Sequence, residues 1–188
     1  MTAGNCRVNL PNIITLMRII LVPVIIWAIA SHQMKLAFAI FVIAGVSDAI
    51  DGFLAKRFNM VTDIGALLDP VADKALLVSI YMTLGISGSI PGWLVILVVS
   101  RDVMIVGAVI ISWLLENPIP MKPLMVSKMN TVAQVAFAAL VLASLGFGFS
   151  AGPYETILMV CVAILTMLSM AFYFVEWARH MSTTELSP

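Results

Sequence analysis

Apolar residues occupy six long stretches of the 188-residue chain, and short segments rich in turn-forming residues separate them. The stretches cover residues 13–30, 36–54, 64–84, 93–115, 131–149 and 157–177. A helix needs about 20 mostly apolar residues to cross the hydrocarbon core of a bilayer, and the six stretches meet or approach that length. Glycine and proline punctuate the breaks GISGSIPG, ENPIPMKP and GFSAGP, as expected of loops between helices. The pattern therefore predicts six transmembrane helices.

The composition agrees with this pattern. Hydrophobic residues make up 62% of the chain and charged residues 11%, with a mean hydropathy of +1.09, whereas a soluble domain carries about 25% charged residues. Ten Lys and Arg balance ten Asp and Glu, so no basic surface for nucleic acid is expected. Cys6 and Cys161 lie far apart with no paired spacing, so they fit neither a disulfide framework nor a zinc motif. We expect one all-α integral membrane domain over residues 1–188.

The distribution of cations predicts the orientation of the six spans, because cytoplasmic loops carry an excess of Lys and Arg. With a cytoplasmic N-terminus, the opposite side holds only Lys35. The cytoplasmic side then holds six cations: Arg7, Lys56, Arg57, Lys122, Lys128 and Arg179. Both termini are therefore expected in the cytoplasm.

The N-terminal region offers an alternative, because residues 19–30 follow Arg18 and end in Ala28-Ile29-Ala30, like a signal-peptide cleavage site. The long region ahead of this stretch and the interrupting Pro23 favour a first transmembrane helix instead. An Arg- and Ser-rich transit segment is also lacking, which favours a bacterial plasma membrane over an organelle.

Four aspartates interrupt the second and third apolar stretches. Asp48 and Asp51 are three residues apart, and Asp69 and Asp73 are four apart, so each pair lies on one face of a helix. A carboxylate at mid-membrane depth costs about 2.5–3.5 kcal/mol, so these side chains must face the bundle interior or an aqueous cavity. Converging carboxylates repel one another unless cations lie between them, and Mg²⁺, Mn²⁺ and Ca²⁺ prefer such oxygen ligands. The spacing therefore predicts a divalent-metal site near the cytoplasmic end.

Small residues accompany these acids. Gly52, Ala55 and Gly65 remove bulk beside the carboxylates, which lets a ligand or a second helix approach closely. In the alternative interpretation, the acids form buried salt bridges with the cations inside the predicted spans, namely Arg18, Lys74 and Arg101. Four clustered acids with three small residues favour a functional site, because ionisable clusters inside membranes are usually functional.

An ion transporter or channel is a competing class, since intramembrane acids also form ion pathways. It predicts acids spread across the depth of the membrane and broken helices in repeated halves. The four aspartates instead cluster toward one face, and no internal repeat is visible.

Residues 48–73 spell D-x-x-D-G-x-x-A-K, then eight residues, then G-x-x-x-D-x-x-x-D. This closely resembles the signature of the CDP-alcohol phosphatidyltransferases, integral membrane enzymes of phospholipid synthesis. The signature fixes eight positions over 26 residues, and seven of them match. The departure is Lys56, where the family usually has arginine; Arg57 follows it. P-N-x-x-T-x-x-R at residues 11–18 also resembles the family's N-terminal helix.

The resemblance implies six transmembrane helices, a homodimer, and one or two divalent metals, Mg²⁺ or Mn²⁺, between the second and third helices. Carried over by position, the metal site comprises Asp48, Asp51, Asp69 and Asp73, and Asp73 is also the general base. The implied cytidine diphosphate site comprises Asp48, Gly52, Ala55, Lys56, Arg57, Gly65 and Asp69. The implied reaction transfers the phosphatidyl group of CDP-diacylglycerol to an acceptor hydroxyl, with release of CMP on the cytoplasmic side.

Three cations are candidates for binding an acceptor phosphate: Arg101, Lys122 and Lys128. Each also has a simpler interpretation. Arg101 precedes Asp102, with which it could pair locally, and the two lysines could serve only the positive-inside distribution.

The residues around Arg101 bear on the identity of the acceptor. Phosphatidylglycerophosphate synthases of this family typically show Arg-Glu here and again eight residues later, whereas this chain has Arg101-Asp102 and then Val109-Ile110. The SRD text and SKMNTVAQ at 127–134 look more like the eukaryotic-type cardiolipin synthases, which use phosphatidylglycerol. We therefore expect phosphatidylglycerol as the acceptor, with glycerol 3-phosphate as the alternative.

Overall fold

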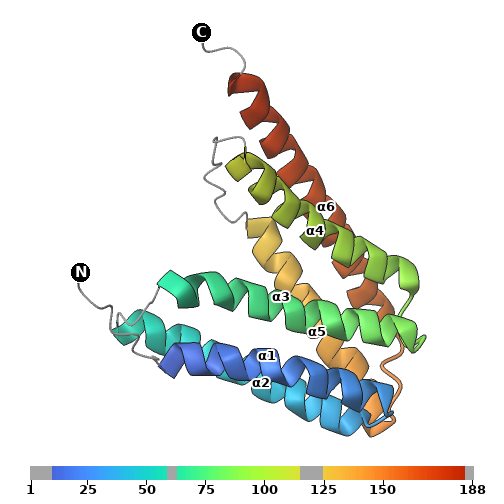
Figure 1. Cartoon of the computed structure of the whole chain (residues 1–188). Helices are drawn as coiled ribbons and strands as arrows, with labels where there is room; N and C mark the ends of the chain where they lie inside the picture. The colour runs from blue at the N-terminus through green and yellow to red at the C-terminus, as the bar shows by residue number, and fades with distance from the viewer. Residues whose placement is uncertain (1–9, 59–62, 115–124, 185–188) are drawn as a thin grey trace. The chain divides into compact units, whose positions relative to one another are not determined.

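A computed structural model describes residues 10–58, 63–114 and 125–184, and their side chains at 17, 19–47, 74–107 and 125–176. The described ranges contain six helices and no strand (Figure 1). They are α1 (Leu10–Ala30), α2 (Met34–Phe58), α3 (Asp63–Ile86), α4 (Gly92–Leu114), α5 (Met125–Phe147) and α6 (Pro153–Thr184).

The all-helical prediction is confirmed, because each predicted stretch falls largely within one of these helices. The bounds differ at polar ends. The helix α5 begins six residues before the predicted stretch, and α6 continues seven residues beyond it. Hydropathy marks only the apolar part of a helix, whereas backbone hydrogen bonding continues through polar residues such as Ser127 and Lys128 at the start of α5.

Two helical segments in the described ranges are long and apolar enough to cross a membrane by length and composition, Met125–Phe147 and Pro153–Glu176. Three further apolar segments are shorter: Ile19–Ala30, Met34–Ser47 and Lys74–Ile86. Only 17% of the apolar window in Pro153–Glu176 is buried within the chain. Large apolar side chains such as Ile157, Met167 and Phe174 are therefore exposed along α6.

The chain divides into two compact units. The first unit comprises residues 1–84 and 142–149, hence α1, α2, most of α3 and the end of α5. In it α1 packs against α2, as Figure 1 shows. Its core is made of buried apolar side chains from these elements, among them Ile25, Ile29, Phe41, Ile80, Tyr81 and Leu142.

A tight turn joins α1 to α2 in the first unit. The Gln33 N–H donates to Ala28 O at 2.8 Å and the His32 N–H donates to Ile29 O at 3.0 Å. This pair of bonds is the Schellman arrangement that closes a helix C-terminus, in which the residue after the cap is left-handed. His32 occupies that position with φ 56°.

The end of α5 lies directly against the beginning of α2. A Cβ placed on Gly146 would lie 3.1 Å from Lys35 N and 3.2 Å from Met34 C. The next residue, Phe147, meets Phe38 edge to face at 5.7 Å between ring centroids, and Lys35 Nζ lies 6.0 Å from the Phe147 centroid. The absence of a side chain at Gly146 therefore permits the close approach of these two helix ends.

The second unit comprises residues 85–141 and 150–188. Here α4 packs against α6, and the two run in the same direction in Figure 1 while α5 runs opposite to α6. Apolar residues such as Leu94, Val98, Phe137 and Val162 are buried. Among its described side chains, six polar or charged residues are buried as well: Arg101, Asp102, Asn130, Gln134, Thr166 and Ser169.

Candidate functional site

The four signature aspartates lie on two consecutive helices. Asp48 and Asp51 are in the last part of α2, and Asp69 and Asp73 are in the first part of α3. The two helices run in opposite directions in Figure 1. The rise of an α-helix is 1.5 Å per residue. Asp51 therefore lies about 10 Å from the C-terminal end of α2, and Asp69 about 10 Å from the N-terminal end of α3. Asp48 and Asp73 lie about 15 Å from the same two ends. Each acid on α2 thus has a counterpart on α3 at a similar distance from the connection between the two helices.

Side chains of the predicted nucleotide–metal site lie outside the described part of the structure. This applies to Asp48, Asp51, Gly52, Ala55, Lys56, Arg57, Gly65, Asp69 and Asp73, although all nine residues belong to α2 or α3. Among the side chains that are described, no group of three His, Cys, Asp or Glu residues could hold a metal ion. The metal prediction therefore rests on the positions of the acids along the two helices.

The donor chemistry of that predicted site fits a hard divalent cation. Four carboxylates supply only oxygen ligands, which Mg²⁺ and Mn²⁺ prefer. The helix bounds place the two pairs at similar distances from the connection between α2 and α3. A single cation site shared by both helices stays a prediction.

The predicted acceptor residues differ in their surroundings. Lys122 lies outside the described residues. Lys128 is exposed in the first turns of α5. Arg101, in contrast, is 1% exposed, although the guanidinium is the most strongly ionised cation in proteins.

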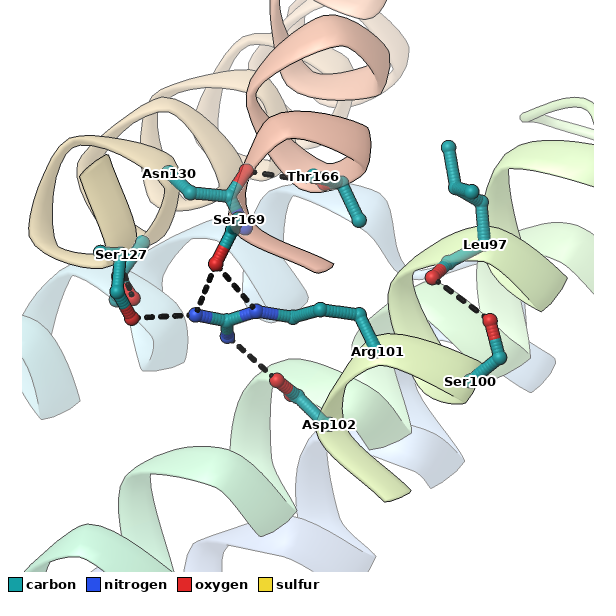
Figure 2. A network of polar contacts seen from close by, with 9 residues as sticks. Leu97, Ser100, Arg101, Asp102, Ser127, Asn130, Thr166 and Ser169 are labelled. Carbon is teal, nitrogen blue, oxygen red and sulfur yellow. Dashed lines mark hydrogen bonds and ion pairs between the residues drawn. The ribbon is translucent and has the colours of Figure 1, made fainter. Parts of the chain in front are cut away.

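Arg101 contacts three other side chains on three helices, which Figure 2 shows. Its Nη1 donates to Asp102 Oδ1 at 2.7 Å. Its Nε and Nη2 donate to Ser169 Oγ on α6 at 3.3 and 3.1 Å. A second hydrogen of Nη2 is donated to Ser127 Oγ on α5. The local ion pair between Arg101 and Asp102 is therefore present, and the two serines add links to α5 and α6.

A second polar contact joins α5 and α6 beside the first. Thr166 Oγ1 donates to Asn130 Oδ1 at 3.0 Å (Figure 2), and both residues are fully buried. The Nδ2 group of Asn130 is buried and has no hydrogen-bond partner within the described structure. An unsatisfied buried amide costs free energy, so this group reduces the stability that the contact between α5 and α6 provides.

The serine, threonine and amide members of these contacts were not predicted from the sequence. Ser127, Asn130 and Gln134 are spaced i, i+3, i+7 and share one face of α5, and Thr166 and Ser169 are spaced i, i+3 on α6. Polar residues at helical spacing within apolar stretches are the signal that could have revealed them. Neutral polar residues are common enough in transmembrane helices to pass unnoticed beside charged ones.

The described chain is thus an all-helical protein with long exposed apolar helices, polar contacts buried between α4, α5 and α6, and four carboxylates at matched positions on α2 and α3. The family model described as CDP-alcohol phosphatidyltransferase matches residues 8–179. The chain belongs to this family.

Several curated relatives are similar to most of the chain. A cardiolipin synthase (CMP-forming) from Rattus norvegicus is 33% identical over 88% of this chain and 60% of its own length. The protein of the same name from Homo sapiens is 32% identical over 91% of this chain and 62% of its own length. A probable phosphatidylglycerophosphate synthase from Mycobacterium tuberculosis is 39% identical over 53% of this chain and 51% of its own length. The chain spans about half to three fifths of the length of these relatives.

Proposed function

We propose that the chain is a phospholipid-synthesis transferase that moves the phosphatidyl group of CDP-diacylglycerol to a hydroxyl of phosphatidylglycerol. The observation that carries the proposal is the set of four aspartates on α2 and α3, at similar distances from the connection between the two helices, within a family match over residues 8–179. In the reaction the acceptor oxygen bonds to the phosphorus of the phosphatidyl group, the bond from that phosphorus to the bridging oxygen breaks, and CMP leaves.

Asp48, Asp51, Asp69 and Asp73 are proposed to hold Mg²⁺ or Mn²⁺, which would neutralise charge on the pyrophosphate and the leaving phosphate. Asp73 is proposed to accept the proton of the acceptor hydroxyl. The proposed pocket for cytidine diphosphate comprises Asp48, Gly52, Ala55, Lys56, Arg57, Gly65 and Asp69. Its small residues leave room for the nucleotide between α2 and α3.

The cations Arg101, Lys122 and Lys128 are proposed to serve the phosphate of the acceptor. Phosphatidylglycerol is favoured because two relatives that cover most of this chain are named cardiolipin synthase (CMP-forming). The second arginine that is typical of phosphatidylglycerophosphate synthases is also replaced by Val109.

Glycerol 3-phosphate is the second candidate acceptor. It is supported by the relative named probable phosphatidylglycerophosphate synthase, which has the higher identity of 39% over a shorter segment. The matched segment covers 53% of this chain, whereas the two cardiolipin synthases match 88% and 91% of it, so its support is weaker. The ion-transporter alternative gains no support from the family assignment.

We further propose that all six helices cross a bacterial plasma membrane with both termini and the acids on the cytoplasmic side, and that two copies form a homodimer. The apolar segments of α5 and α6 and the exposed apolar side chains of α6 support the membrane setting. A site at the membrane boundary lets the tails of both lipids stay in the bilayer while the nucleotide is reached from water.

A CMP-release assay on the purified chain in detergent tests the proposed reaction. CDP-diacylglycerol and Mg²⁺ or Mn²⁺ are supplied, and phosphatidylglycerol and glycerol 3-phosphate are offered separately. We expect release with phosphatidylglycerol and a matching cardiolipin product. Release with glycerol 3-phosphate alone would replace the first candidate with the second, and no release with either acceptor would contradict both.

A further inference from the structure

The guanidinium of Arg101 is committed to side chains of its own protein. A guanidinium has five N–H donors and no acceptor. Four of these donors are directed at Asp102, Ser127 and Ser169 (Figure 2). Within the described structure a single N–H, on Nη1, is left for any other partner. If Arg101 were to bind a phosphate directly through a bidentate contact, some of its existing hydrogen bonds would have to break.

The charge of Arg101 is balanced as well. Asp102 Oδ1 lies 2.7 Å from Nη1, and both side chains are largely buried, at 1% and 9% exposed. A buried ion pair of opposite charges presents little net field to a third group. Arg101 is thus both buried and paired with an opposite charge, whereas Lys128 is exposed.

The link to Ser127 reaches the first turn of α5, which begins at Met125. Lys128 is the next residue, and it is exposed whereas Ser127 is half-buried. Consecutive residues on a helix point about 100° apart. Fixing Ser127 against α4 and α6 therefore fixes the direction in which Lys128 leaves the helix.

We infer that Arg101 is a positioning residue, which holds the first turn of α5 through Ser127 and Ser169 and thereby orients Lys128 toward the phosphate of the acceptor. The inference rests on the proposed function, because it refines the roles of two proposed acceptor residues. It also gives roles to Ser127 and Ser169, which anchor the guanidinium from α5 and α6.

The test separates positioning from direct binding by keeping the charge of Arg101 and removing its anchors. Steady-state CMP release is measured for Ser127→Ala/Ser169→Ala and for Arg101→Gln, with the concentrations of acceptor and CDP-diacylglycerol varied in turn. We expect both variants to raise the acceptor KM by about tenfold, while kcat and the KM for CDP-diacylglycerol change less than about twofold. A general loss of packing would instead lower kcat and change both KM values.

Ser100→Ala is the matched control, because Ser100 is next to Arg101 but its hydroxyl donates to Leu97 O of the same helix at 3.1 Å (Figure 2). It should leave the acceptor KM unchanged. Ser169→Thr keeps a hydroxyl and should stay near the wild-type value. If Arg101→Gln does not fold, the serine double variant still decides, because it keeps the guanidinium.

Lys128→Gln completes the test. If Arg101 acts through Lys128, Arg101→Gln should add less than about twofold to the acceptor KM in the Lys128→Gln background. The inference is overturned if the two effects multiply, or if the serine double variant keeps the wild-type acceptor KM. Wild-type protein that releases no CMP with either acceptor would instead overturn the proposed function and this inference together.

Discussion

Two places in the described structure contain residues whose conformation or burial costs free energy. One is the left-handed His32 between α1 and α2, and the other is the group of polar side chains buried between α4, α5 and α6. A left-handed backbone costs a non-glycine residue roughly 1–2 kcal/mol, and a buried polar group is costly unless it is hydrogen-bonded. Both places are therefore sensitive to single substitutions.

His32→Gly should stabilise the chain by about 1 kcal/mol, because glycine adopts a positive φ without steric cost at the position that closes a helix. Thermal unfolding in detergent would show the gain as a higher Tm. His32→Ala is the control, since alanine keeps the left-handed cost. Equal Tm values for the alanine and glycine variants would contradict the interpretation of the φ of 56°.

Thr166→Val should destabilise the chain by about 1–3 kcal/mol. Valine matches threonine in shape but leaves the buried Asn130 Oδ1 without its donor, and an unsatisfied buried acceptor costs that amount. Thr131→Val is the matched control, because the Thr131 hydroxyl donates to Ser127 O within α5. Unfolding monitored by circular dichroism should separate the two variants, and identical shifts would count against the contact.

The acids and the neutral polar residues differ in how far the sequence alone reveals them. Asp48, Asp51, Asp69 and Asp73 could be singled out because a charge inside an apolar stretch is rare and costly. Ser127 and Ser169 carry a weaker signal. Their helical spacing marks a polar helix face, but it does not reveal that their partner Arg101 lies on a third helix. The pairing of Arg101 with Asp102 was foreseeable because the two residues are neighbours in sequence.

At the scale of the element, the helices were largely predictable and their contacts were not. The six apolar stretches correspond in order to the six helices. Apolar runs mark the buried or lipid-facing parts of helices, and the glycine- and proline-rich segments between them mark the helix ends. The approach of α5 to α2 at Gly146 was not foreseen, because a glycine near a helix end is expected to cap it. Only the 3.1 Å distance from a Cβ to Lys35 N reveals the packing role.

Gly146→Ala should destabilise the chain by about 1–3 kcal/mol, because its methyl group would press against the backbone of Met34 and Lys35, which cannot move aside cheaply. Gly45→Ala provides a contrast of opposite sign. Gly45 lies inside α2 with nothing within 4 Å of an added Cβ, so alanine there should gain up to about 1 kcal/mol of helix propensity. Melting temperatures that move in the same direction would refute the distinction.

The pair α2 and α3 should bind the divalent metal as a unit. Removing metal with a chelator should abolish CMP release, and added Mg²⁺ or Mn²⁺ should restore it. Asp51→Asn removes one negative oxygen ligand, so restoration should need at least about tenfold more metal. Mn²⁺ binding followed by electron paramagnetic resonance provides a readout apart from activity, and unchanged Mn²⁺ affinity in Asp51→Asn would exclude this residue as a ligand.

At the scale of the whole molecule, the proposed topology places both chain ends on the side that carries most of the cations. A reporter that is active only in the cytoplasm should work when fused to either terminus and should fail when inserted between α5 and α6, near Gly152. If each of the six helices crosses the membrane once, the two ends lie on the same side. Reporter signals of opposite sign at the two termini would contradict six crossings.

The buried position of Arg101 also has a consequence for the biogenesis of the protein. Residues Arg101 and Asp102 both lie on α4, and each ionised side chain placed singly at mid-bilayer costs about 2.5–3.5 kcal/mol. The hydroxyls that surround the guanidinium belong to α5 and α6, which the ribosome synthesises later. We therefore expect α4 to remain beside the insertion machinery until α6 emerges, so that truncation before Ser169 leaves a nascent chain that is retained or degraded.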